Sequence, residues 1–140
     1  MDRIIGIDYG KARIGVAISD WLGMMAHARA TIPATSWDNA IAEIVQLARQ
    51  EQVTFFVVGL PYNMDGSEGP AAASAKLFGE KLATASGLPV KYWDERMSTM
   101  FAQDILHSAG RKTKRSKPVI DQVAAQVILQ SYMDANPLEE

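Results

Sequence analysis

A short apolar segment that ends in an acid constrains this chain more than any other feature. Residues 4–7 read Ile-Ile-Gly-Ile, which is typical of a buried β-strand, and Asp8 follows them directly. An ionised carboxylate at the end of a buried strand is costly unless it is paired, hydrogen-bonded or bound to a metal. The rest of the chain must therefore supply a partner for Asp8, which is either a nearby cation such as Arg13 or a metal ion shared with other acids.

The hydrophobic pattern beyond this segment predicts a mixed α/β fold. We expect strands over 3–8, 13–19, 26–32, 53–58 and 89–93, and helices over 37–52, 70–86, 98–109 and 118–135. The first three strands can form an antiparallel meander, and the last two can return parallel to the first through right-handed crossovers. The prediction is a five-stranded mixed sheet flanked by helices, in a single domain over residues 1–137 with a frayed tail at 138–140.

Composition excludes several classes of protein. The 140 residues include no cysteine, which rules out disulfides and thiolate metal sites. No apolar run approaches the ~20 residues of a membrane-spanning helix. The N-terminus also lacks a basic start followed by an apolar core, so we expect a cytoplasmic protein that makes no membrane contact.

The cations are distributed unevenly along a chain whose net charge is only −2. Five of them lie within seven residues: Arg111, Lys112, Lys114, Arg115 and Lys117. Such a run is most often only a solvated surface, but here it leads directly to Asp121. We therefore favour a contact between this basic segment and the phosphates of a substrate.

Four acids are placed where a metal site can form. Asp8 ends the first strand, Asp94 and Glu95 end the last strand, and Asp121 begins the last helix. Sites in open α/β sheets form outside the carboxyl ends of the strands. Carboxylates are the ligands that Mg²⁺ and Mn²⁺ prefer, and two such ions can promote the hydrolysis of a phosphodiester. The acids thus suggest a metal-dependent phosphoesterase.

Each acid also has a simpler interpretation, and these alternatives stay open. Glu95 could pair with Arg96 or face water, and Asp94 could serve as a hydrogen-bonding residue at the strand end. Asp121 could be a favourable charge near a helix N-terminus, where it would contribute ~0.3–1 kcal/mol. Arg13 and Arg96 could bind phosphate through their forked donors, or could be structural partners of the acids.

Four blocks of sequence together resemble the YqgF family, also called RuvX, of pre-16S ribosomal RNA nucleases. They read DYGKARIGVA at 8–17, GLP with Asn63, Asp65, Gly66 and Ser67 at 59–67, DERMST at 94–99, and Lys117 with Asp121, Ala124, Ala125, Ile128 and Leu129 at 117–129. The order and spacing of the blocks are specific, although each block alone is weak. The resemblance runs from the first strand to the last helix.

The resemblance implies an RNase H-like fold and a metal-dependent endonuclease that trims the 5′ end of precursor 16S ribosomal RNA. Asp8, Glu95 and Asp121 match the catalytic, metal-binding triad of the family, with Mg²⁺ or Mn²⁺ as cofactor. Related nucleases often carry an acid on the fourth strand, whereas Gly59 follows that strand here, so Glu95 would supply the second ligand. The expected substrate contacts are Arg13, Arg96, Arg111, Lys112, Lys114, Arg115 and Lys117. The expected partner is structured nucleic acid, bound by a monomer or a weak homodimer.

Three other functions compete with this hypothesis. Structured DNA is an alternative substrate, because the family has been compared with Holliday-junction resolvases. The chain could also be a nucleic-acid-binding module without catalysis, although all three acids are present. A nucleotide-binding fold of the actin and sugar-kinase type would need two domains, and 140 residues are too few for two.

Overall fold

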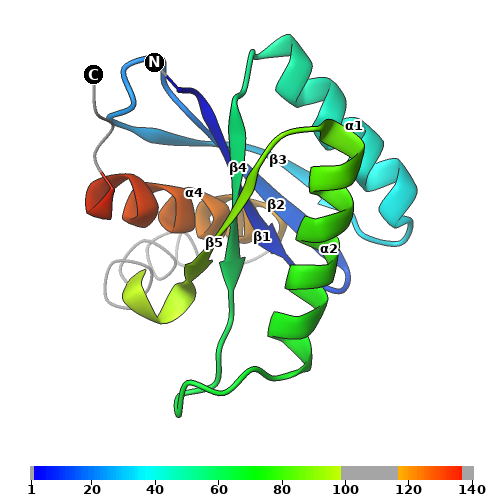
Figure 1. Cartoon of the computed structure of the whole chain (residues 1–140), viewed down its shortest axis with the longest axis vertical. Coiled ribbons are helices and arrows are strands. Elements are labelled where there is room, and N and C mark those ends of the chain that lie inside the picture. Colours follow the sequence, from blue (N-terminus) through cyan, green and yellow to red (C-terminus); the bar gives the residue numbers. More distant parts are fainter. Residues whose placement is uncertain (1, 99–116, 137–140) are drawn as a thin grey trace.

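The computed structural model describes residues 2–98 and 117–136, which form a five-stranded sheet with helices on both faces (Figure 1). The elements are β1 (Ile4–Tyr9), β2 (Arg13–Ser19), β3 (Ala26–Pro33), α1 (Trp37–Gln50), β4 (Phe55–Leu60), α2 (Pro70–Ser86), β5 (Val90–Asp94), the 3₁₀ turn η1 (Glu95–Ser98) and α4 (Lys117–Ala135). The strand order is β3-β2-β1-β4-β5. The first three strands pair antiparallel, and β4 and β5 run parallel to β1, which confirms the predicted mixed sheet.

Strand β4 differs from its prediction in a way that affects the site. It covers Phe55–Leu60, whereas the apolar run had placed it at 53–58. Val53 belongs instead to the connection after α1, where its amide donates to the Ala48 carbonyl. At the other end, Gly59 and Leu60 continue the ladder by pairing with Trp93 and Asp94 of β5. Gly59 is therefore a strand residue and not the first residue of a loop.

Several predicted features lie outside the described residues. They are the predicted helix over 98–109 beyond its first residue, the cations Arg111, Lys112, Lys114 and Arg115, and the tail at 138–140. We expected Asp121 at the beginning of the last helix. Lys117 is the first residue of α4, so Asp121 is its fifth residue and lies beyond the first turn. The single domain over 1–137 stays a prediction. Within 2–98 and 117–136, no helix combines the length and the apolar character needed to cross a membrane.

Successive side chains along each strand point to opposite faces of the sheet, so the core is divided into two layers. Ile5, Ile7 and Val58 face the layer that α1 and α2 cover. Their neighbours in sequence, such as Ile4 and Val57, face the opposite layer under α4. Figure 1 shows α4 crossing one face of the sheet while α1 and α2 lie on the other. A residue on β1, β2 or β4 can therefore be assigned to a face by its parity.

Glycines under α4 allow this helix to lie directly on the backbone of the sheet. A Cβ atom on Gly6 would be 2.6 Å from Cβ of Leu129. A Cβ atom on Gly15 would be only 2.0 Å from the Asp121 carbonyl oxygen. A residue with a side chain at either position would force the helix outward, so these strand glycines set how closely α4 approaches. That approach determines where the acid at position 121 lies.

Candidate active site at the carboxyl end of β1

Asp8 lies on the face of the sheet that α4 covers. It shares this face with Ile4 and Gly6, both of which lie under the helix. Asp8 is paired with Gly15 across the antiparallel β1–β2 ladder. The parallel β1–β4 ladder pairs Ile7 with Val58, one residue before Asp8 and Gly59. Asp8 is thus flanked by a glycine on each neighbouring strand.

A second and a third acid lie over these two glycines. The backbone of Asp121 packs on Gly15 through its carbonyl oxygen. Oε2 of Glu95 is 3.0 Å from the position that a Cβ atom of Gly59 would occupy. The structure therefore brings Asp8, Glu95 and Asp121 to one end of three adjacent strands, from β1, η1 and α4 respectively. Glycines inside strand patterns are the sequence signal for such a close approach of backbones.

The electrostatics show that two of these carboxylates are poorly stabilised as anions. Burial and the nearby charge of Asp121 raise the pKa of Asp8 from 3.8 to about 6. Burial, together with the charges of Asp8 and Asp94, raises the pKa of Glu95 from 4.5 to about 7. Strong perturbation of this kind is typical of functional sites, because a structural acid is usually placed beside a compensating charge.

Asp94 has a different environment from its neighbour Glu95. Its carboxylate accepts hydrogen bonds from the Arg96 amide at 2.9 Å and from the Arg96 Nη2 at 2.6 Å. These bonds lower the pKa of Asp94. Asp94 therefore acts as the hydrogen-bonding residue at the end of β5, and Glu95 is the acid that faces Asp8.

Arg13 forms an ion pair with Asp121, whereas the sequence suggested Asp8 as its partner. Its Nε donates to Oδ2 of Asp121 at 2.7 Å, across the interface between β2 and α4. Within 2–98 and 117–136 the salt bridges include none to Asp8, so the alternative of an Asp8–Arg13 pair is not found. Asp8 is left as a partly buried carboxylate among other carboxylates.

The carboxylates at this edge are chemically suitable ligands for a divalent cation, but they are not arranged around one common position. Among the described residues, no three acids or histidines are arranged closely enough to enclose a metal ion. Asp8 and Glu95 nevertheless provide hard carboxylate oxygens whose mutual repulsion a cation would relieve. The donor set therefore suits Mg²⁺ or Mn²⁺, while the carboxylate of Asp121 is held by Arg13.

The loop after β4 contacts the same edge through Arg96. The Arg96 guanidinium lies 5.6 Å from the ring centre of Tyr62 and close to Gly66. Within the loop, the side chains of Asp65 and Ser67 bond to each other at 2.6 Å. Arg96 keeps 40% of its side-chain surface exposed although it is paired with Asp94. It can therefore be both a structural partner and a surface contact for phosphate.

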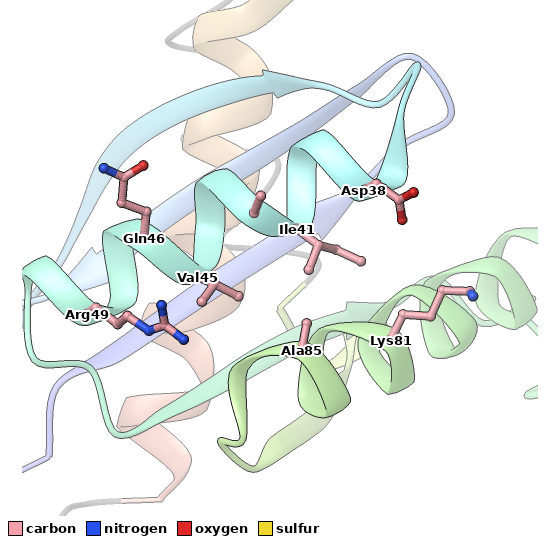
Figure 2. Close-up of a pocket in the computed structure, with 8 residues that line it drawn as sticks. Asp38, Ile41, Val45, Gln46, Arg49, Lys81 and Ala85 are labelled. Carbon is pink, nitrogen blue, oxygen red and sulfur yellow. The ribbon is translucent and has the colours of Figure 1, made fainter.

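A hollow on the surface of the described residues lies away from the three acids. It is a groove of about 590 Å³ between α1 and α2, on the opposite side of the sheet from α4. Figure 2 shows Ile41, Val45 and Ala85 lining it, with Asp38 and Lys81 toward one end. None of the three acids lines this groove, so we place the candidate site at the edge of the sheet around Asp8.

Comparison with known proteins establishes the family of the chain. The family model RuvX, described as "Holliday junction resolvase", matches residues 2–135. The chain belongs to the RuvX family. A relative from Myxococcus xanthus, named "Putative pre-16S rRNA nuclease", is 46% identical over 134 residues, covering 96% of this chain and 89% of the relative. A relative of the same name from Symbiobacterium thermophilum is 47% identical over 133 residues, covering 95% and 92%.

Solved structures agree with the RuvX assignment at the level of the fold. RuvC of Thermus thermophilus, solved in complex with a Holliday-junction substrate, superposes with a TM-score of 0.66 at 13% identity and covers 99% of both chains. The Holliday-junction resolvase of fowlpox virus superposes with a TM-score of 0.58 at 12% identity, covering 95% of this chain and 99% of that one. These similarities confirm the predicted RNase H-like fold.

The raised pKa of Glu95 predicts a specific pH dependence of stability. Between pH 4.5 and about 7, the folded protein binds more protons at Glu95 than the unfolded chain does, so the free energy of unfolding falls as pH rises. Glu95→Gln removes this effect. In EDTA, we expect the variant to match the wild type near pH 4 and to be more stable by about 1–3 kcal/mol at pH 7.5. Urea unfolding at both pH values measures this, and an equal difference at the two pH values would contradict it.

Proposed function

We propose that this protein is a metal-dependent endonuclease that hydrolyses phosphodiester bonds in structured RNA, with precursor 16S ribosomal RNA in the cytoplasm as its substrate. The observation that carries the proposal is the position of Asp8 between Gly15 and Gly59, with Glu95 and Asp121 over these glycines. The names of the RuvX relatives support the substrate. We expect the protein to act as a monomer or a weak homodimer.

Asp8 and Glu95 are the residues that would hold the divalent cation, and Asp121 would complete the ligand set from α4. When bound, such an ion lowers the pKa of a coordinated water and neutralises charge on the leaving oxygen. Asp8 lies at the end of the central strand, so the sheet holds its backbone in a defined position. Arg96, with its exposed guanidinium next to Glu95 in sequence, is suited to bind a backbone phosphate of the substrate.

Structured DNA is the second candidate substrate. It is supported by the description of the family model and by the Holliday junction bound in the RuvC structure of similar fold. The same acidic site can act on either polymer, because the scissile group is a phosphodiester in both. The substrate has to be determined by comparing the two directly.

Cleavage assays test the proposal. The purified protein is incubated with precursor 16S RNA and with a four-way DNA junction, each in Mg²⁺, Mn²⁺ and EDTA. We expect RNA cleavage that requires the metal, with little or no cleavage of the junction. Metal-dependent cleavage of the junction alone would replace RNA by DNA as the substrate. Binding of nucleic acid without cleavage in any metal would favour the non-catalytic module.

The basic segment before α4 stays a prediction as a phosphate contact, and the salt dependence of binding tests it. Neutralising Lys112 and Lys114 together (Lys112→Gln and Lys114→Gln) is expected to lower the slope of log K against log salt by about 2, roughly one for each phosphate that the variant no longer neutralises. The slope is measured by fluorescence anisotropy in Ca²⁺ or EDTA, where the RNA stays intact. Neutralising two lysines of α2, Lys76 and Lys81, is the matched control. Equal slopes in the two variants would contradict a role for the basic segment.

A further inference from the structure

Arg13 holds the side chain of Asp121 while β2 holds its backbone. Arg13 is the first residue of β2 and, like Gly15, faces α4 by parity. Its Nε donates to Oδ2 of Asp121 at 2.7 Å, and the Asp121 carbonyl lies against Gly15 two residues further along the same strand. Both contacts come from β2, so this strand determines where the acid lies and how its carboxylate is turned.

The orientation of this carboxylate leaves one oxygen for another ligand. Arg13 binds Oδ2, and the hydrogen bonds among the described residues include none to Oδ1 of Asp121. Asp8 pairs with Gly15 across the β1–β2 ladder, and the Asp121 carbonyl packs on Gly15, so Asp121 lies next to the central acid while Arg13 binds its carboxylate. Carboxylates that bind metals are usually hydrogen-bonded by an outer partner that fixes their orientation.

We propose that Arg13 is a positioning residue that, by binding Oδ2 of Asp121, holds this carboxylate beside Asp8 with Oδ1 available to a divalent cation. The inference rests on the proposed function, because it assigns Arg13 to the metal site. It also revises the expectation that Arg13 contacts the substrate. A phosphate contact would change the affinity for nucleic acid, whereas a positioning residue changes the affinity for the metal in the absence of substrate.

Binding of Mn²⁺ to the protein alone provides the direct test. Free Mn²⁺ is measured by electron paramagnetic resonance for the wild type, Arg13→Gln and Arg13→Lys, at a temperature where circular dichroism shows each to be folded. We expect Arg13→Gln to weaken Mn²⁺ binding by about 10–100-fold. Arg13→Lys should be intermediate, because an ammonium keeps the charge but lacks the planar fork of the guanidinium.

A matched control separates this effect from the loss of any ion pair. Arg3, near the start of β1, forms a 2.6 Å ion pair with Glu51 at the opposite end of the strand from Asp8. Arg3→Gln should lower stability without changing the Mn²⁺ affinity of the folded protein. An Arg13→Gln variant that binds Mn²⁺ as tightly as the wild type overturns the proposal and leaves Arg13 as a structural link between β2 and α4.

A double-mutant cycle tests whether Arg13 acts through Asp121. If it does, Arg13→Gln should have no further effect on Mn²⁺ affinity in a protein that already carries Asp121→Asn. Independent, additive effects of the two substitutions would contradict the proposed route. Failure of the proposed function would be recognised by a different result. A wild-type protein that binds no Mn²⁺ at millimolar concentration would overturn both the metal site and the role of Arg13.

Discussion

Asp8→Asn should abolish metal-dependent cleavage and, at the same time, make the metal-free protein more stable. The carboxylate lies between Glu95 and Asp121, and its pKa is raised to about 6, so its ionised form is unfavourable in the fold at pH 7.5. Asparagine has nearly the same shape and no charge. We expect a gain of about 1–3 kcal/mol in the free energy of unfolding in EDTA. Loss of a metal ligand should lower the cleavage rate by about 10³-fold or more.

Opposite changes in stability and activity are the specific signature of this prediction. Urea unfolding in EDTA gives the stability, and single-turnover cleavage of precursor RNA in Mn²⁺ gives the rate. Asp38→Asn is the control, because Asp38 is an exposed acid of α1 beside the groove of Figure 2. It should leave the cleavage rate unchanged. An Asp8→Asn protein that is less stable than the wild type at pH 7.5 would show that Asp8 is a structural acid.

Gly15→Ala should displace α4 and with it the acid at position 121. The added Cβ atom would be 2.0 Å from the Asp121 carbonyl oxygen and 2.6 Å from its carbonyl carbon, both backbone atoms that cannot rotate away. Overpacking of this kind typically costs about 1–3 kcal/mol, and we expect the upper end of this range or more. Cleavage should fall strongly in the fraction that remains folded, because a small displacement of a catalytic group has a large effect on rate.

Two other glycines provide matched comparisons. At Gly59, an added Cβ would first meet the Ile128 Cδ1 at 2.6 Å and Oε2 of Glu95 at 3.0 Å, which are the ends of side chains and can move. Gly59→Ala should therefore be less destabilising than Gly15→Ala. Gly87 has a φ of 72° and no atom within 4 Å of an added Cβ. Gly87→Ala should lower stability through backbone strain while the cleavage rate per folded molecule stays unchanged.

Stability and cleavage rate are measured for each of these three variants, by thermal or urea unfolding and by the cleavage assay. Together they test whether the close packing of α4 on the sheet determines the geometry of the site. We expect Gly15→Ala to lose more stability than Gly59→Ala. Gly15→Ala should also lose cleavage activity, whereas Gly87→Ala should keep it. A Gly15→Ala protein with wild-type cleavage would mean that the position of α4 does not determine the site.

Local sequence patterns were sufficient to predict most of the architecture. The β-branched runs around Ile4 and Val57 specify buried strands whatever their distant neighbours are. The prediction of α2 was accurate because its ends are local signals, with Pro70 at the start and Gly87 in the left-handed conformation at the end. The end of β4 was misplaced because a glycine after an apolar run is typical of a loop, whereas Gly59 continues the pairing with β5.

The sequence by itself determined the kinds of residue that gather at the site, and the tertiary structure decided which of them interact. Asp8, Glu95 and Asp121 could be selected because each ends or begins a recognisable element. Arg13 and Arg96 could be expected to pair with acids, but the choice of Asp121 for Arg13 and of Asp94 for Arg96 could not be predicted. An ion pair depends on distances of a few ångströms between segments, and α4 reaches that distance from β2 only because a glycine lies between them.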